Sequence, residues 1–200
     1  NTNQLTLKFN NEIVGEIPIE ALTSKAPLYD RKWTKTKLPE KKINIKDLKK
    51  VKLEEAFLKI LSSPNQSNKK WITEQFDQMV MCDTSQRSGS DAAVVRIHNK
   101  DKSIALTVDS SANYCKAHPL TGGKQIVSES WRNLISVGAL PIAMTNCLNF
   151  GNPENPKIMG EFAECVLGIK EACEFLNFPV VSGNVSLYNG TNKKNIYPTP

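Results

Sequence analysis

The stretch LPIAMTNCLNFGNP (residues 140–153) decides the fold, together with the shorter stretch FPVVSGNVS (residues 178–186). In each stretch an apolar run, residues 140–144 or 178–181, predicts a β-strand, and the remaining residues predict a polar loop at the end of that strand. The Asn and Gly residues of such loops offer carboxamides and backbone N–H groups, which suit phosphate oxygens and a hydrated divalent cation. Two such loops indicate a nucleotide site rather than a packed core.

A helix-sized segment separates the two stretches. Asn155 is expected to cap this helix, and Pro156 stands at its first position, where helices favour proline. An earlier helix is expected to be capped by Thr121 and to end at Gly138. Both segments repeat apolar residues at helical spacing: Val127, Trp131, Leu134 and Ile135 in the first, and Ile158, Phe162, Val166, Ile169, Cys173 and Leu176 in the second.

Two β-branched runs precede these helices, at residues 92–97 and 104–108, and a turn at 99–101 makes them a hairpin-like unit. The order of elements is then strand, strand, helix, strand, helix, strand. This order predicts an α+β fold built of α/β layers.

The first 70 residues have a different organisation. Residues 4–9 and 13–17 predict a β-hairpin around Asn10-Asn11, and residues 24–50, rich in Lys and lacking periodicity, predict a domain boundary. A short amphipathic helix is expected over 53–61. Because two strands alone are marginally stable, the hairpin is expected to belong to a larger sheet, and the chain to be a piece of a longer protein.

Composition excludes several classes of protein. With 40% apolar and 23% charged residues the chain is neither disordered nor fibrous. No apolar run approaches the roughly 18 residues of a membrane span. Its five cysteines form no C-x-x-C pair, which favours reduced thiols and a cytoplasmic protein. A zinc site is not expected, because the chain has only two histidines to complete one.

The net charge of +6 is unevenly distributed. Residues 24–70 carry 13 Lys and one Arg against five acidic residues, a balance of +9, whereas the rest of the chain has a balance of −3. A solvated linker is the favoured interpretation of this basic segment. A nucleic-acid-binding arm is rejected, because the segment has few aromatic residues to stack on bases and matches no known module.

The two Asn-rich loops supply the candidate site residues. Asn146, Asn149 and Asn152 either form Asx turns or bind a ligand, and the sequence leaves both readings open. In the second loop Gly183 permits close approach of a ligand to the backbone. Asn184 offers a carbonyl oxygen to Mg²⁺, and the Ser186 hydroxyl offers a hydrogen bond to a polar substrate.

Other candidates are weaker. Asp109 ends a strand and either faces a metal or, as is favoured, caps the following turn. Gly122 and Gly123 offer free N–H groups to phosphate but lack the rest of a dinucleotide or P-loop motif. His118 precedes a proline, and a surface or turn role is favoured for it over an acid–base role. No Cys or Ser motif accompanies it, so nucleophilic catalysis has no support. Trp131 and Phe162 are expected in the core.

Longer motifs carry a resemblance to a known family. The stretches GSDAAVVR (89–96), NCLNFGNP (146–153), VSGNVSLYN (181–189) and IYPTP (196–200) resemble those of phosphoribosylformylglycinamidine synthase, in its small synthetase subunit. The stretches EIP (16–18) and APLY (26–29) extend the resemblance over the whole chain.

This resemblance implies an ATP-dependent ligase of purine biosynthesis. The family converts formylglycinamide ribonucleotide, glutamine-derived ammonia and ATP to the amidine, ADP and phosphate, with Mg²⁺ neutralising the transferred phosphate. Its partners are a glutaminase subunit and a small bridging subunit. Neither nucleic acid nor a membrane is expected as a partner.

The resemblance also implies roles for residues of this chain. Asn146 and Gly183 would bind ATP, Asn184 would be a metal ligand, and Ser186 would bind the substrate. Asn146 stands where the family often has Asp, and Asn113 stands near a position where Arg is common. The family's catalytic histidines lie in a half that this chain does not contain, so no catalytic residue is assigned and the isolated chain is expected to be inactive.

The implied architecture is a tandem of two halves, each like aminoimidazole ribonucleotide synthetase. Residues 1–30 would end the C-terminal-type domain of the first half, 31–70 would form a basic linker with a short helix, and 71–200 would be the N-terminal-type domain of the second half. Two alternatives stay open: another synthetase of the same superfamily, or a half that binds nucleotide only for structure.

Overall fold

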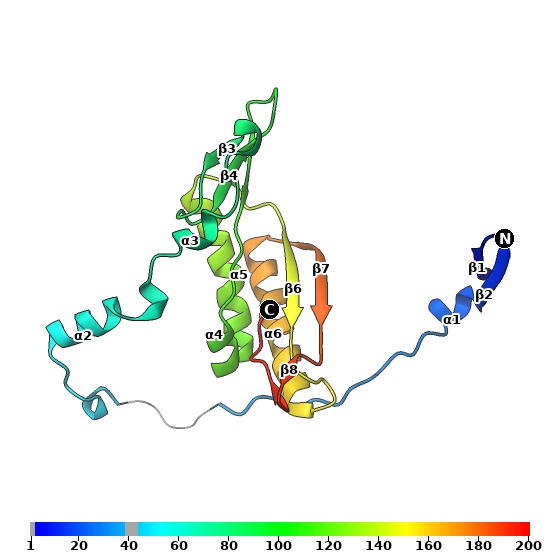
Figure 1. The fold of residues 1–200 in the computed structure, drawn as a ribbon. Coiled ribbons are helices and arrows are strands. Elements are labelled where there is room, and N and C mark those ends of the chain that lie inside the picture. Colours follow the sequence, from blue (N-terminus) through cyan, green and yellow to red (C-terminus); the bar gives the residue numbers. More distant parts are fainter. Residues whose placement is uncertain (1–2, 39–43) are drawn as a thin grey trace. The chain divides into compact units, whose positions relative to one another are not determined.

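The computed structural model describes residues 3–38 and 44–200. It divides the chain into two units, Asn1–Lys32 and Trp33–Pro200, each with its own elements (Figure 1). Among the described helices, none has both the length and the apolar character needed to cross a membrane.

The first unit is the predicted hairpin. Strands β1 (Gln4–Phe9) and β2 (Glu12–Pro18) pair antiparallel, and helix α1 (Ile19–Leu22) follows. Asn10 and Asn11 form the turn with φ of 47° and 65°, the left-handed backbone that asparagine tolerates better than most residues. The hairpin expected from Asn10-Asn11 is therefore confirmed.

The second unit begins with an irregular segment that contains short helices. The amphipathic helix expected over 53–61 is confirmed as α2 (Leu53–Leu61). A single helical turn, α3 (Lys70–Thr73), follows it. The described residues of this part also form the 3₁₀ turns η1 (Ile45–Asp47), η2 (Pro64–Gln66) and η3 (Val80–Cys82).

A small antiparallel sheet comes next. It consists of β3 (Thr84–Gln86), β4 (Ala93–Arg96) and β5 (Ser103–Leu106), in that spatial order. The central pairing sets Val94 opposite Ala105. The hairpin-like unit expected from the two β-branched runs is confirmed, although both strands are shorter than the runs.

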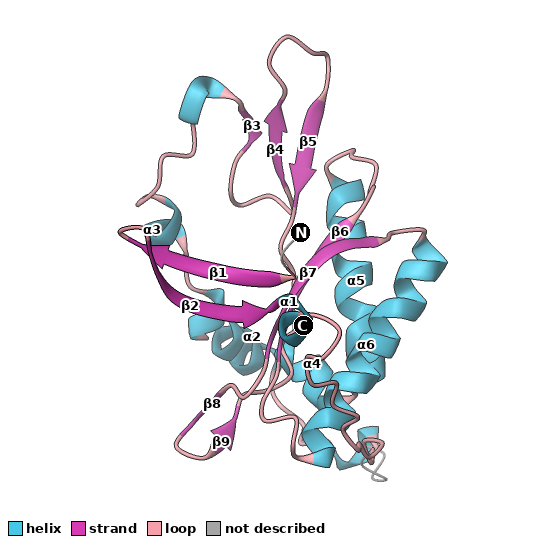
Figure 2. Ribbon diagram, turned by 90° about the vertical axis from the view of Figure 1, so that its right-hand side faces the viewer, coloured by secondary structure: helices cyan, strands magenta, loops and turns pink. Residues whose placement is uncertain are grey.

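The core of the second unit lies among three helices and a parallel strand pair. The helices are α4 (Ala112–Ala117), α5 (Pro119–Ser136) and α6 (Pro156–Leu176). Strands β6 (Met144–Asn149) and β7 (Val180–Ser186) pair parallel, and Figure 2 shows α5 and α6 together on one side of them. Two short strands, β8 (Gly190–Thr191) and β9 (Lys194–Asn195), follow.

Aromatic side chains from the loops close this core. Phe150 and Phe178, each 1% exposed, pack with Val127 of α5 and Leu148 of β6. Burial of a side chain of this size contributes about 1.5–3 kcal/mol. Trp131 and Phe162 pack against the same cluster, which confirms their predicted place.

Glycines let the helices approach closely. A Cβ on Gly123 of α5 would lie 2.4 Å from the carbonyl oxygen of Cys165, and one on Gly168 of α6 would lie 2.0 Å from that of Leu120. The predicted phosphate-binding role of Gly122 and Gly123 is wrong, because both are buried inside α5 and the Gly122 N–H donates to His118. These glycines serve packing.

Helix boundaries correct some of the predictions. Thr121 does not cap α5; His118 does, since its Nδ1 accepts the Thr121 N–H at 3.3 Å and Pro119 begins the helix. The cap of α6 is confirmed, because Asn155 Oδ1 accepts the Lys157 N–H at 3.0 Å. Two residues of the expected apolar stripes, Val166 and Ile135, are exposed by 38% and 43%, whereas Cys165, which was not assigned to a stripe, is fully buried.

The two deciding stretches fold differently from the prediction. The apolar run 140–144 is not a strand, because Pro141 lacks a donor for pairing, and Leu140 and Ile142 are about as exposed as surface residues at 79% and 76%. The strand lies instead over the polar residues, Met144–Asn149. Likewise β7 runs on through the predicted loop to Ser186.

The cysteines are free thiols, as expected. Cys115, Cys165 and Cys173 are buried and Cys82 and Cys147 are exposed. Burial raises the pKa of the Cys173 thiol, and the neighbouring Cys115 together with burial raises the pKa of Cys165.

Substituting Gly123 by Ala tests the helix contact. In an open helix this change stabilises by about 1 kcal/mol, but here overpacking against Cys165 is expected to cost about 1–3 kcal/mol. Amide hydrogen exchange in α6 of the full-length protein measures the effect. Gln125→Ala, on the exposed side of the same helix, is the control with an expected change within about 0.5 kcal/mol. A stabilised Gly123→Ala variant would contradict the packing role.

Candidate functional site

The parallel pairing of β6 with β7 brings the predicted site residues together. Asn146 lies opposite Gly183, Cys147 opposite Asn184, and Asn149 opposite Ser186. Residues that are 37 positions apart in the sequence thus lie opposite each other in one ladder. They lie within strands and not, as the sequence suggested, in loops beyond strand ends.

Asn146 and Gly183 form a close contact. A Cβ at Gly183 would lie 1.9 Å from Asn146 Oδ1, so only glycine leaves the Asn146 carboxamide its present position. Asn146 is half-buried, and Gly183 is exposed. The two residues predicted to bind ATP therefore adjoin each other.

Ser186 is held by a polar network at the end of β7. Its Oγ lies 3.3 Å from Asn189 Oδ1 and 3.1 Å from Asn189 Nδ2, which also donates to the carbonyl oxygens of Ser186 and Phe150 at 2.9 and 3.1 Å. The half-buried hydroxyl is thus oriented before any ligand arrives.

Asn184 differs from its neighbours. It is exposed on β7, and within the described part of the chain its carboxamide has no hydrogen-bond partner. An exposed amide oxygen is a suitable donor to Mg²⁺, which keeps several water ligands and is commonly shared with a substrate phosphate. The described residues contain no group of three or more His, Cys, Asp or Glu side chains that could hold a metal ion.

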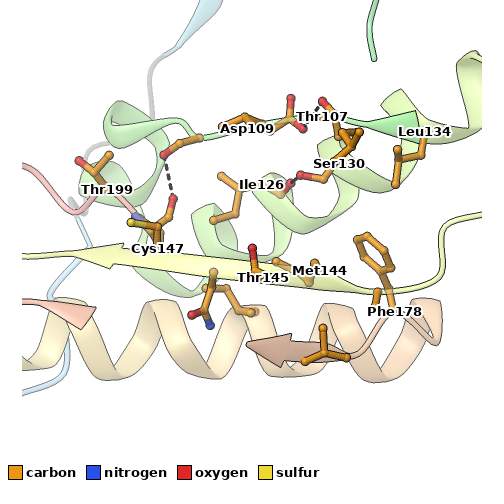
Figure 3. Close-up of a pocket in the computed structure, with 18 of the residues that line it drawn as sticks. Thr107, Asp109, Ile126, Ser130, Leu134, Met144, Thr145, Cys147, Phe178 and Thr199 are labelled. Carbon is orange, nitrogen blue, oxygen red and sulfur yellow. Dashed lines mark hydrogen bonds between the residues drawn. The ribbon is translucent and has the colours of Figure 1, made fainter. Parts of the chain in front are cut away.

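A cavity of about 600 Å³ lies beside β6 (Figure 3). Its walls come from the segment 105–110, from α5, from β6 and from the last two residues. Of the four predicted site residues only Asn146 lines it, whereas Gly183, Asn184 and Ser186 do not. The structure therefore brings Asn146 to both the cavity and the exposed β7 residues.

Asp109 lies at the wall of this cavity. Its carboxylate accepts hydrogen bonds from Thr107 Oγ1 at 2.8 Å and from Asn133 Nδ2 at 2.7 Å. It does not cap the following helix: Ser111 is the N-cap residue of α4, and its side chain makes no capping bond. The favoured capping role is therefore wrong, and Asp109 is a carboxyl group that two hydrogen bonds hold at the wall of a ligand-sized cavity.

Sequence reasoning missed Asn133, the residue that orients Asp109. It lies on α5, 24 positions from its partner, and no local pattern distinguishes it from any polar residue on a helix. Only the packing of α5 under the segment 105–110 shows the pair.

Two of the three asparagines in the first stretch have structural roles. Asn152 Oδ1 accepts the Glu154 N–H at 2.9 Å, an Asx turn. The Asn149 side chain donates to the carbonyl oxygens of Cys147 and Thr199, joining β6 to the last residues. The Asx-turn alternative therefore holds for Asn152, whereas Asn149 lies in β6 and forms no such turn, and Asn146 remains the ligand candidate.

Both histidines have structural partners. His118 caps α5, and His98 Nε2 lies 2.7 Å from Asp83 Oδ2. Neither histidine is among the residues that line the cavity. The site therefore offers amides, hydroxyls and one carboxylate for binding and contains no histidine for proton transfer.

The helices and strands that surround the site form a domain of the α+β class. The family model "AIR synthase related protein, N-terminal domain" matches residues 89–200. The chain belongs to this family of AIR synthase related proteins.

Individual relatives are more specific. The chain is 57% identical, over all its 200 residues, to the phosphoribosylformylglycinamidine synthase subunit PurL of Pelagibacter ubique, and 48% identical to that of Azorhizobium caulinodans. It spans 27% of the length of each. The resemblance inferred from the motifs is thereby confirmed.

Solved structures agree with these relatives. Thermotoga maritima PurL complexed with ADP matches with a TM-score of 0.73 at 33% identity, over 98% of this chain and 30% of that one. The structure of PurLQS from the same organism matches with a TM-score of 0.72 at 34% identity, over the same shares. The predicted α+β fold, of the aminoimidazole-ribonucleotide-synthetase-like type, is confirmed.

The contact between Gly183 and Asn146 can be tested by a double-mutant cycle. Gly183→Ala is expected to displace the Asn146 carboxamide and to destabilise β7 by about 1 kcal/mol. With Asn146→Ala already present, the same change should cost little, giving a coupling energy of at least about 0.5 kcal/mol. Hydrogen exchange of the β6 and β7 amides in the full-length protein measures all four variants. Additive effects would show that the two residues do not interact.

Proposed function

We propose that the chain is part of an ATP-dependent ligase that converts formylglycinamide ribonucleotide, glutamine-derived ammonia and ATP to formylglycinamidine ribonucleotide, ADP and phosphate. The β6–β7 register carries this proposal, because it sets the four residues with implied ligand roles on neighbouring rungs. The 57% identity to a phosphoribosylformylglycinamidine synthase subunit supports it. Thermotoga PurL complexes with ATP, ADP and FGAR, at 33–35% identity, support it further.

Each residue has a defined part in the proposal. Asn146 and Gly183 bind ATP, the first through its carboxamide and the second by leaving the backbone open to close approach. Ser186, oriented by Asn189, donates a hydrogen bond to the nucleotide substrate. Asn184 holds Mg²⁺, which neutralises charge on the transferred phosphate when it is bound.

These residues bind and orient. The reaction transfers the terminal phosphate of ATP to the formyl amide oxygen of the substrate, and ammonia then displaces phosphate at that carbon. Correct placement of two reactants accounts for a large part of such a rate enhancement. Groups that move protons are expected from other parts of the full-length protein, since both histidines here have structural partners.

The domain roles and partners belong to the same proposal. Residues 1–30 end the C-terminal-type domain of a first half, 31–70 are a basic linker, and 71–200 are the N-terminal-type domain of a second half. A glutaminase subunit supplies ammonia and a small bridging subunit joins the complex, in the cytoplasm. The match to Thermotoga PurLQS supports assembly with other subunits.

Two substitutions in the full-length protein test the residue roles. Ser186→Ala is expected to raise KM for formylglycinamide ribonucleotide about tenfold, because one hydrogen bond is worth about 1–1.5 kcal/mol. Asn184→Ala is expected to weaken binding of ADP with Mg²⁺ in calorimetry by a similar factor. Ser182→Ala, on the same exposed strand and without an assigned role, is the matched control.

The outcomes separate the remaining alternatives. Loss of turnover in both variants supports a working site. Unchanged turnover with a loss of nucleotide-dependent stability would show a structural nucleotide site instead. Turnover only with another small molecule, in a substrate panel, would point to a different synthetase of the superfamily.

The isolated 200 residues are expected to be catalytically inactive. The reason is that they contain only His98 and His118, which pair with Asp83 and cap α5. A coupled assay for ADP release, with formylglycinamide ribonucleotide, ATP, Mg²⁺ and ammonia, checks this, with the full-length protein as the positive control. Substrate-dependent ADP release by the isolated chain would refute it.

A further inference from the structure

Residues Trp33–Thr36, here termed the strap, lie along helix α6. The Thr34 N–H donates to the Pro156 carbonyl oxygen at 3.0 Å, and the Thr36 N–H donates to Glu164 Oε2 at 2.9 Å. The strap therefore contacts α6 from the first residue of the helix, Pro156, to its third turn, at Glu164. In Figure 1 its blue trace passes the yellow beginning of α6.

Gly160 shapes the surface that receives the strap. A Cβ at this position would lie 1.9 Å from the Thr34 carbonyl oxygen, so every other residue would push the strap away. Glycine inside a helix costs about 1 kcal/mol relative to alanine. The contact of the strap with α6 gives a reason for this loss of helix stability, because only glycine leaves room for the Thr34 carbonyl oxygen.

Glu164 provides the second anchor. Its residue is only 6% exposed, and buried carboxylates need a hydrogen-bond donor to offset desolvation. The Thr36 N–H is the donor that the structure gives it. The neighbouring buried carboxylate, Glu161, has a different partner in Lys116.

The strap is anchored next to residues 150–155, here termed the site loop, which joins β6 to α6. Phe150 and Gly151 accept the N–H groups of Asn189 and Tyr188, each at 3.1 Å, and the Asn152 N–H donates to Asn195 Oδ1 at 2.9 Å. Asn189 in turn orients Ser186. The first strap anchor, Pro156, directly follows this loop.

We infer that the strap is a tether that holds the site loop in place, with Gly160 and Glu164 as its positioning residues. The strap begins at Trp33, the first residue of the second unit, and its first anchor on α6 is the Pro156 carbonyl oxygen. This inference concerns the site loop itself and does not depend on the proposed reaction.

Limited proteolysis of the full-length protein tests docking. Lys35 lies within the strap and Lys37 directly follows it, and both side chains are exposed. Lys49 and Lys50 are also exposed but lie outside the strap. Trypsin is expected to cut after Lys35 and Lys37 at least tenfold faster in Gly160→Val and Glu164→Ala than in the unmodified protein. Cleavage after Lys49 and Lys50 should not change.

Two further variants separate tethering from general loss of structure. Glu164→Gln keeps an acceptor oxygen for the Thr36 N–H and should restore protection, whereas Glu174→Ala, on the exposed side of α6, should resemble the unmodified protein. Equal cleavage in Glu164→Ala and the unmodified protein would overturn the docking.

Hydrogen exchange measures the effect on the site loop. In Glu164→Ala the amides of Asn152 and Tyr188 are expected to exchange at least fivefold faster, while the central amides of α5 keep their rates. Unchanged exchange in the site loop, together with a released strap, would overturn the tethering role. Faster exchange across α5 as well would also overturn it, because the effect would then be global.

Discussion

The parallel pairing of β6 with β7 is the constraint on which the rest of the second unit depends. Parallel neighbours require a crossover connection, and α6 with its flanking loops provides it. The register then fixes which side chains share a rung, so that Asn146 meets Gly183 and Asn149 meets Ser186. A slip of one residue would reverse the face of every side chain in the strand.

The helix packing stabilises this pairing. A two-stranded sheet is marginal on its own, and β7 is exposed over most of its length. The close approach of α5 to α6 at Gly123 and Gly168 compensates by letting both helices bury Leu148, Phe150 and Phe178 in one cluster. Gly122 and Gly123 are both buried inside α5, and the Gly122 N–H is bonded to the His118 carbonyl oxygen, which explains why this Gly-Gly pair was misleading as a phosphate-binding motif.

Local signals predicted the elements, but not the contacts that assemble the site. The hairpin turn and the start of α6 could be predicted from the sequence, because each depends on the backbone preferences of neighbouring residues, Asn10-Asn11 and Asn155-Pro156. The strand over 144–149 was misplaced because the polar Asn146 shares its more buried face with Met144 and Leu148, which breaks the alternation and leaves a weaker signal than the apolar run before it. The Asp109–Asn133 pair joins residues 24 positions apart, and the Thr36–Glu164 bond joins residues 128 positions apart, so neither leaves a local pattern.

The basic segment docks through its backbone and not through its charge. Glu161 and Glu164 lie less than one turn apart on α6, and both are buried. Lys116 of α4 pairs with the first, and the Thr36 N–H bonds to the second, while the strap lysines, Lys35 and Lys37, are exposed. Surface charges of this kind are screened by salt and contribute little to a specific contact. The specificity of the strap therefore rests on the absence of a side chain at Gly160 and on one buried acceptor.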